Sequence, residues 1–291
     1  MAEAYFDEAP FILKDFLSYM ETIKGKSMNT IHEYYYDLRL FFRFMKIHKG
    51  LESKDKDFES IDIKDIDVEM LKEITLSDLY SYMSFLSRDR DNNSSSRARK
   101  VASIKSFFNY MTNKAKVLEQ NPALELESPK IMKRLPRYLN IEESKKLLGA
   151  IDGEHRERDF AIITLFLNCG LRLSELVGIN LNRIKNDTLT VVGKGDKERT
   201  IYLNAACKRA IEAYLKVRPV DGVKDKNALF LSERKQRISN KTVQHIVKKY
   251  IKAAGLDPER YSTHKLRHTA ATLMYRHGKV DIRALQEILG H

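Results

Sequence analysis

The residues best suited to chemistry lie near the end of the chain, in residues 262–291. Ser262 or Thr263 can cap the start of a helix, which puts His264 and Arg267 three residues apart on one helical face. An imidazole beside a permanent guanidinium is an arrangement that grips a phosphate group. The same spacing is also common on solvated helices, so the pair alone assigns no function.

A second, shorter helix is predicted after this one. Gly278 ends the first helix, Asp281 caps the start of the second, and Gly290 ends it. His291 would then stand at a helix end, turned back toward the pocket that His264 faces.

Two histidines of the first helix, His264 and His268, are spaced as in helices that bind zinc. That motif needs a glutamate directly after the first histidine to act as the base, and Lys265 stands there. No nearby carboxylate or cysteine in the sequence offers a third ligand. We therefore predict a site without a metal, and we expect no other cofactor.

A second arginine, Arg172, stands between apolar neighbours on both sides. A cation is costly to bury there unless it is paired. Glu175 can be its partner in a purely structural ion pair. Alternatively, Arg172 belongs to a buried phosphate site in which Glu175 orients it.

A lysine lies at the tip of a predicted β-hairpin. Residues 188–192 and 199–203 alternate between apolar and polar as strands do, and they flank a glycine-bounded turn that carries Lys194. Lys194 is either a plain surface charge or a proton donor presented on a turn.

Composition places the chain among globular proteins that bind a polyanion. Of 291 residues, 43% are hydrophobic, and no apolar run reaches the length of a membrane span. The N-terminus lacks an export signal, and Cys169 and Cys207 have no paired spacing, so we expect a cytoplasmic location. The net charge of +12 favours nucleic acid as partner.

The charge is unevenly spread along the chain. Residues 51–74 carry nine acids and four bases, and they are predicted to form an exposed insertion. Residues 88–137 carry twelve bases and five acids, and no acid occurs between Arg97 and Met111. Such segregation indicates a face for nucleic acid rather than a device for solubility alone.

Apolar spacing predicts a small helical domain over residues 1–127, with two helices in 10–47, a third over 76–87 and a basic fourth from Arg97. Two prolines and four bases without periodicity in residues 128–137 indicate an extended basic linker, placed at 128–136, and residues 137–291 are predicted to form a second domain. The predicted fold is mainly α with a small β-hairpin or sheet, in two domains that form a clamp around DNA.

Three basic or hydroxyl-rich elements are predicted to contact DNA: the start of the second helix, the basic helix, and the segment that leads into a helix at residue 240. The expected contacts are Lys26, Ser27, Asn29, Thr30, Arg97, Arg99, Lys100, Ser103, Lys105, Arg237, Ser239, Lys241 and Gln244.

Four motifs in this order resemble those of the tyrosine recombinases, and within them the Xer and phage-integrase-like members. Residues 170–176 resemble the box of the first catalytic arginine, and residues 193–195 the hairpin lysine. Residues 264–268 resemble the His-x-x-Arg box, and residues 289–291 the last histidine. The resemblance extends from about Phe11 to His291.

The resemblance implies a site-specific recombinase that cuts DNA through a 3′-phosphotyrosyl intermediate. Arg172, Lys194, His264, Arg267 and His291 are the implied catalytic residues, with Glu175 behind them. The partner is a duplex recombination site, bound by a tetramer on paired sites, with a second recombinase or an accessory protein left open. The family's tyrosine lies roughly nine residues past the last histidine. We therefore expect the 291-residue chain to lack the nucleophile, to bind DNA without cleaving it, and to be mostly monomeric off DNA.

Two other readings stay open. A type IB topoisomerase shares the catalytic set and relaxes supercoils without needing a specific site. A DNA-binding regulator on an inactive recombinase scaffold binds DNA without cleaving it.

Overall fold

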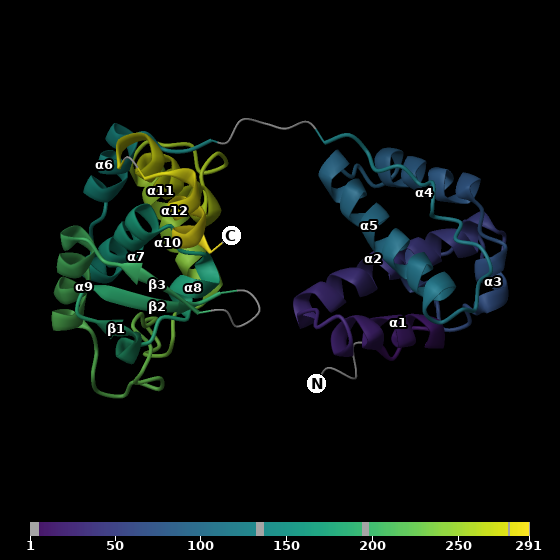
Figure 1. Ribbon diagram of the computed structural model, residues 1–291, viewed down its shortest axis with the longest axis horizontal. Helices are drawn as coiled ribbons and strands as arrows, with labels where there is room; N and C mark the ends of the chain where they lie inside the picture. The colour runs from purple at the N-terminus through teal and green to yellow at the C-terminus, as the bar shows by residue number, and fades with distance from the viewer. Residues whose placement is uncertain (1–5, 132–136, 194–197, 279, 291) are drawn as a thin grey trace. The chain divides into compact units, whose positions relative to one another are not determined.

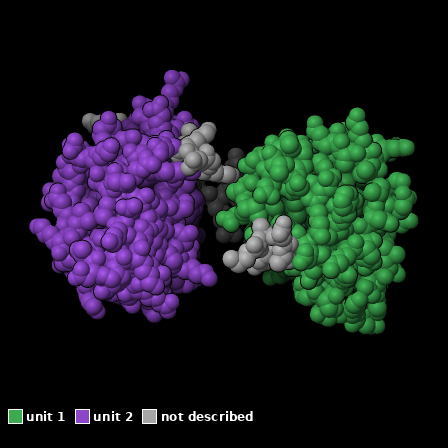
Figure 2. Space-filling model, turned by 90° about the horizontal axis from the view of Figure 1, so that it is seen from below, with its two compact units in different colours: residues 1–133 green, residues 134–291 purple. Residues whose placement is uncertain are grey.

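The computed structural model describes residues 6–131, 137–193, 198–278 and 280–290. The chain divides into two compact units, residues 1–133 and 134–291 (Figure 1 and Figure 2). Each unit has its own apolar core. In the described residues no helix is both long and apolar enough to span a membrane.

Unit 1 is helical in its described part (Figure 1). Its elements are α1 (Phe11–Thr22), α2 (Met28–His48), the 3₁₀ turn η2 (Phe58–Ser60), α3 (Val68–Lys72), α4 (Leu76–Arg88) and α5 (Ser94–Asn113). Apolar residues recur every three or four positions along α1, α2 and α5, so each helix turns one face inward. The centre of the unit is aromatic: the rings of Phe16, Phe107 and Phe42 meet edge to face at centroid distances of 5.5 Å.

The expectation of an exposed insertion over residues 51–74 fits residues 51–60, none of which is buried, but was wrong for residues 61–74. Ile61, Ile63 and Ile66 are buried to within a few per cent of full burial. Two cations of α2 also hold the stretch, Arg43 through the carbonyl of Ile61 and Lys46 through the carboxylate of Asp65 at 2.8 Å. The acidic side chains point outward, but the buried isoleucines between them anchor the backbone. A count of charged residues does not detect these isoleucines.

Unit 2 combines helices with a small antiparallel sheet of order β1-β2-β3. Its elements are α6 (Ile141–Gly149), α7 (Arg156–Cys169), α8 (Leu173–Val177), η3 (Leu181–Arg183), β1 (Ile184–Lys185), β2 (Thr188–Val192), β3 (Glu198–Tyr202), α9 (Ala205–Val217), α10 (Asn240–Ala253), α11 (Thr263–His277) and α12 (Ile282–Leu289). The mainly α fold with a small sheet agrees with the fold class that the sequence predicts.

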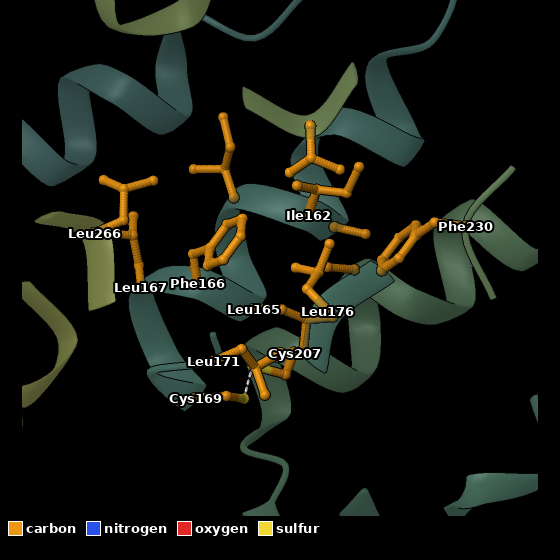
Figure 3. Close-up of a cluster of buried hydrophobic side chains, with 14 of the residues drawn as sticks. Ile162, Leu165, Phe166, Leu167, Cys169, Leu171, Leu176, Cys207, Phe230 and Leu266 are labelled. Atoms are coloured by element: carbon orange, nitrogen blue, oxygen red, sulfur yellow. Dashed lines mark hydrogen bonds between the residues drawn. The ribbon is translucent and has the colours of Figure 1, made fainter. Parts of the chain in front are cut away.

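The helix α7 is the centre of unit 2. It is buried on nearly all sides and packs against α9 and α11. Figure 3 shows its side chains Ile162, Leu165 and Phe166 among apolar groups from α8, α11 and the segment after α9. Because α7 is fixed so firmly, the turn that follows it holds its residues in defined positions.

Candidate active site

A left-handed turn at Gly170 presents Arg172. Gly170 ends α7 with φ +58°, and a Cβ there would lie 2.7 Å from a methyl carbon of Leu289. Glycine alone combines this backbone conformation with so close a neighbour. Two residues later Arg172 takes the N-cap position of the short helix α8. The buried core therefore sets where the arginine emerges.

A single buried carboxylate, that of Glu175, holds the arginine in place. Its side chain is 0% exposed, and its Oε1 accepts a 2.6 Å bond from the Arg172 guanidinium. Oε2 accepts from the Arg172 backbone N–H at 2.7 Å and from the Arg199 guanidinium at 2.6 Å. Burial alone would raise the pKa of Glu175, but these bonds outweigh it and lower the pKa below 4.5. Glu175 is therefore ionised at neutral pH.

A third arginine, Arg267 of α11, reaches the same carboxylate. Its Nη1 lies 3.6 Å from Glu175 Oε2 and donates a 2.7 Å bond to the carbonyl of Gly170. Burial and the nearby Arg172 lower the pKa of Arg267 to about 10, so it remains a cation at neutral pH.

The three guanidiniums also meet the C-terminal end of α12. Arg199 donates to the carbonyl of Ile288. Arg267 donates to the carbonyl of Leu289 at 2.5 Å, and Arg172 donates to the carbonyl of Gly290 at 2.9 Å. These carbonyls have no partner within their own helix and carry partial negative charge. Three arginines thus share one carboxylate and one helix end, and this surplus of positive charge suits an anion such as phosphate.

The imidazole of His264 lies one helical turn before Arg267. Its Nε2 is 3.0 Å from the Nε2 of His268, so one ring donates and the other accepts. Burial lowers the pKa of His264 below 6.5, and the positive charges of Lys265 and Arg267 lower it further. A neutral imidazole at pH 7 is able to accept a proton.

Comparison with known proteins shows the family to which the chain belongs. The sequence model of the phage integrase family matches residues 137–291. The chain is 62% identical over 282 residues to the tyrosine recombinase XerC of Caldanaerobacter subterraneus subsp. tengcongensis, which covers 97% of this chain and 80% of that protein. The chain belongs to the phage integrase family of tyrosine recombinases. Another relative, the XerC of Thermodesulfovibrio yellowstonii, is 33% identical over 290 residues, 97% of this chain and 88% of that one.

Solved recombinases share the fold of this tyrosine recombinase. The XerH site-specific recombinase bound to a palindromic difH substrate matches with a TM-score of 0.72, 22% identity, and coverage of 96% of this chain and 78% of that chain. A λ integrase tetramer bound to a Holliday junction matches with a TM-score of 0.71, 17% identity, and coverage of 96% and 76%. The arginine cluster therefore lies in a chain with both the sequence and the fold of a Xer-like recombinase.

Of the predicted catalytic residues, the structure brings Arg172 and Arg267 together on Glu175. Lys194 and His291 lie outside the described residues. Sequence reasoning missed Arg199, which it treated only as the start of a strand. A signal was present, because Arg199 stands two positions before the buried Ile201 on β3 and so shares its inward side.

On α5 the predicted DNA contacts of this recombinase fall into two groups. Arg99 keeps a side chain that is 45% exposed, although its Nη1 pairs with Asp37 at 2.5 Å and with Glu33 at 2.8 Å. Lys100 and Ser103 are buried, and both bond to the carboxylate of Asp37 on α2, Lys100 at 2.7 Å and Ser103 at 2.8 Å. These two side chains join α2 to α5 beneath the exposed surface.

Two more members of the basic set bond within unit 1. Arg97 donates to the hydroxyl of Ser87 at 2.9 Å, and Lys105 donates to the carbonyl of Leu124 at 3.2 Å. At the start of α2, Lys26, Ser27 and Asn29 are exposed, and the Ser27 hydroxyl lies 3.1 Å from that of Thr30.

In unit 2, the N-terminus of α10 presents Ser239 as its N-cap, with Lys241 and Gln244 exposed on the first turns. Arg237 instead fastens the preceding loop to the rest of the unit. It bonds Asp225 at 2.8 Å and the carbonyl of Val177 at 2.9 Å.

Proposed function

We propose that this chain is the DNA-binding and phosphate-handling part of a site-specific recombinase that cuts and rejoins strands through a 3′-phosphotyrosyl intermediate. The observation that carries the proposal is the convergence of three arginines on the single carboxylate of Glu175. Such a cluster needs an anion to complete it, and the family supplies one, the scissile phosphate.

The proposed reaction follows from where charge develops. A tyrosine oxygen attacks the phosphorus and the bond to the 5′-oxygen breaks, leaving a 3′-phosphotyrosyl link and a 5′-hydroxyl. Arg172 and Arg267 bind the non-bridging oxygens, whose negative charge grows in the transition state. His264 accepts the proton of the tyrosine, Lys194 protonates the leaving 5′-oxygen, and His291 donates a hydrogen bond to the phosphate.

The nucleophile in this proposal is a tyrosine outside residues 1–291. Tyr261 packs against the apolar core of unit 2, and burial raises its pKa. Tyr275 is 52% exposed near the end of α11, two turns past Arg267. Among the described residues, the hydrogen bonds of Arg172 and Arg267 go to Glu175 and to backbone carbonyls.

We further propose that both domains, 1–127 and 137–291, grip the duplex as a clamp joined by the linker 128–136. Exposed Arg99 of unit 1 and Lys241 of unit 2 neutralise phosphates or meet base edges. Lys100 and Ser103 support this face from within through Asp37.

Four copies assemble on paired sites, as in the λ integrase tetramer on its junction, whereas the 291-residue chain is a monomer off DNA.

Covalent capture on DNA tests the proposal. The probe is a nicked duplex selected from a random pool by its affinity for the 291-residue chain. A protein extended to include the family's tyrosine should give a protein–DNA band that resists denaturant and is lost on proteolysis. Arg172→Ala or Arg267→Ala in that protein should remove the band and keep most of the binding.

Three outcomes contradict the proposal. If the extended protein binds its duplex but never forms the band, the chain is a regulator on an inactive scaffold. If the 291-residue chain itself forms the band, the nucleophile lies within it, with Tyr261 and Tyr275 the first to test. Relaxation of supercoiled DNA without a selected site would favour a type IB topoisomerase.

A further inference from the structure

Arg199 is a largely buried cation that no predicted role explains. It lies on β3, opposite Val191 of β2, and its side chain is 11% exposed. Burying a guanidinium is unfavourable unless partners satisfy its donors. A methionine or leucine at this inward position would fill the space at no such cost, so stability alone does not account for an arginine here.

The partners of Arg199 come from two separate elements. Its Nη2 donates a 2.6 Å bond to Oε2 of Glu175, and its Nη1 donates to the carbonyl of Ile288 at the end of α12. Its Nε is buried and has no hydrogen-bond partner among the described residues. Gly290 packs over this atom, because a Cβ on Gly290 would lie 3.0 Å from the Arg199 Cδ and 3.2 Å from its Nε.

The contact with Glu175 bears directly on Arg172. Oε2 of Glu175 receives both Arg199 and the backbone N–H of Arg172, while Oε1 receives the Arg172 guanidinium. Without Arg199, Oε2 would be open to the Arg172 guanidinium as well as to Arg267, whose Nη1 already lies 3.6 Å away. A bidentate pair between the two side chains would then hold Arg172 more closely to the carboxylate.

We propose that Arg199 is a positioning residue: it occupies Glu175 Oε2 and fixes the end of α12, so that the Arg172 guanidinium keeps donors directed at a phosphate. This inference rests on the proposed function, because it assumes that Arg172 handles the scissile phosphate. Arg199 thus joins Arg172 and Arg267 in handling the phosphate, but it acts through Glu175 and α12 rather than by touching the DNA.

Two substitutions at this position separate charge from geometry. Arg199→Lys keeps the charge, but one ammonium cannot bond Glu175 and the carbonyl of Ile288 in the same planar fork. Arg199→Met keeps similar volume without charge. Arg183→Met is the matched control, because Arg183 forms an exposed ion pair with Glu198 beside the same sheet, with 44% and 51% of the two side chains exposed.

Side-chain NMR of the arginine-labelled 291-residue chain monitors the hydrogen bonding of the Arg172 guanidinium without any reaction taking place. In the unsubstituted chain and in Arg183→Met, the bonds of Arg172 should slow rotation of its guanidinium. Arg199→Lys and Arg199→Met should both change the Arg172 side-chain resonances, and the amide spectrum should remain that of a folded protein. Arg172 resonances that are the same in all four proteins would overturn the inference.

The rate of adduct formation by the extended protein measures the effect of Arg199 on the reaction. Both Arg199 variants should form the covalent adduct about 100-fold more slowly, with an unchanged dissociation constant for the duplex. Adduct formation at the unsubstituted rate, or a loss of binding equal to the loss of rate, would overturn the inference. If the unsubstituted extended protein forms no adduct, the proposed function fails, and the NMR result still decides whether Arg199 positions Arg172.

Discussion

Replacing Glu175 with glutamine should destabilise unit 2 by about 3 kcal/mol at neutral pH. Breaking a buried ion pair by removing one partner costs about 3–5 kcal/mol, because the other charge is left uncompensated. Glu175 is fully buried and serves two guanidiniums at 2.6 Å, which favours a large effect. Arg172 is 31% exposed, so water screens part of the loss and the lower end of the range applies.

The assay for Glu175→Gln is urea denaturation followed by circular dichroism, with hydrogen exchange to assign each transition to its unit. Glu198→Gln is the control, since this ion pair with Arg183 is about half exposed and should contribute less than 1 kcal/mol. A Glu175→Gln protein as stable as the Glu198→Gln protein would refute the central place given to this carboxylate.

The Glu175 carboxylate should also make the stability of unit 2 depend on pH. The folded-state pKa of Glu175 is lowered below 4.5, so the unfolded chain takes up the proton first as the pH falls. The stabilisation is therefore complete above about pH 4.5 and is lost as the pH falls through the folded-state pKa. Glu175→Gln should lack this part of the acid dependence, which stability curves at several pH values measure.

Three further predictions concern the turn, the base and the DNA face. Gly170→Ala should destabilise unit 2 more than Gly255→Ala in urea denaturation, since both have positive φ but only the first Cβ meets Leu289 at 2.7 Å. The rate of adduct formation should hold from pH 8 to about 6.5 and fall only below that, because the pKa of His264 is depressed and its neutral form is the base; half-loss above pH 6.5 would contradict this. Arg99→Ala should reduce the slope of log affinity against log salt by about one, because 45% of the Arg99 side chain is exposed although it pairs with Asp37 and Glu33. Arg237→Ala should leave the slope unchanged in an anisotropy titration, because only 28% of that side chain is exposed and its donors bond Asp225 and the carbonyl of Val177.

Local patterns in the sequence were enough to predict the helical class, the two longer strands and the contact between Arg172 and Glu175. Each depends on residues close together in the chain, where spacing determines which side chains share a face. The strand β1, only two residues long, gives no such pattern and was not predicted.

Contacts between distant residues were beyond that reasoning. Asp37 looks like a surface acid of α2, yet it is 1% exposed because its partners Arg99, Lys100 and Ser103 arrive from α5 more than sixty positions away. The role of Arg199 likewise depends on Glu175 and on the end of α12, which the fold alone brings together. A basic helix was therefore predicted correctly as an element, while which of its charges point outward required the structure.

The most direct test of the account compares two substrates at the scissile position. A methylphosphonate replaces one charged non-bridging oxygen of the phosphate with a neutral methyl group. If Arg172 binds those oxygens, Arg172→Ala in the extended protein should slow adduct formation on the phosphate at least about 100-fold and have little effect on the methylphosphonate. An equal loss on both substrates would contradict the claim that the arginine cluster around Glu175 handles the phosphate.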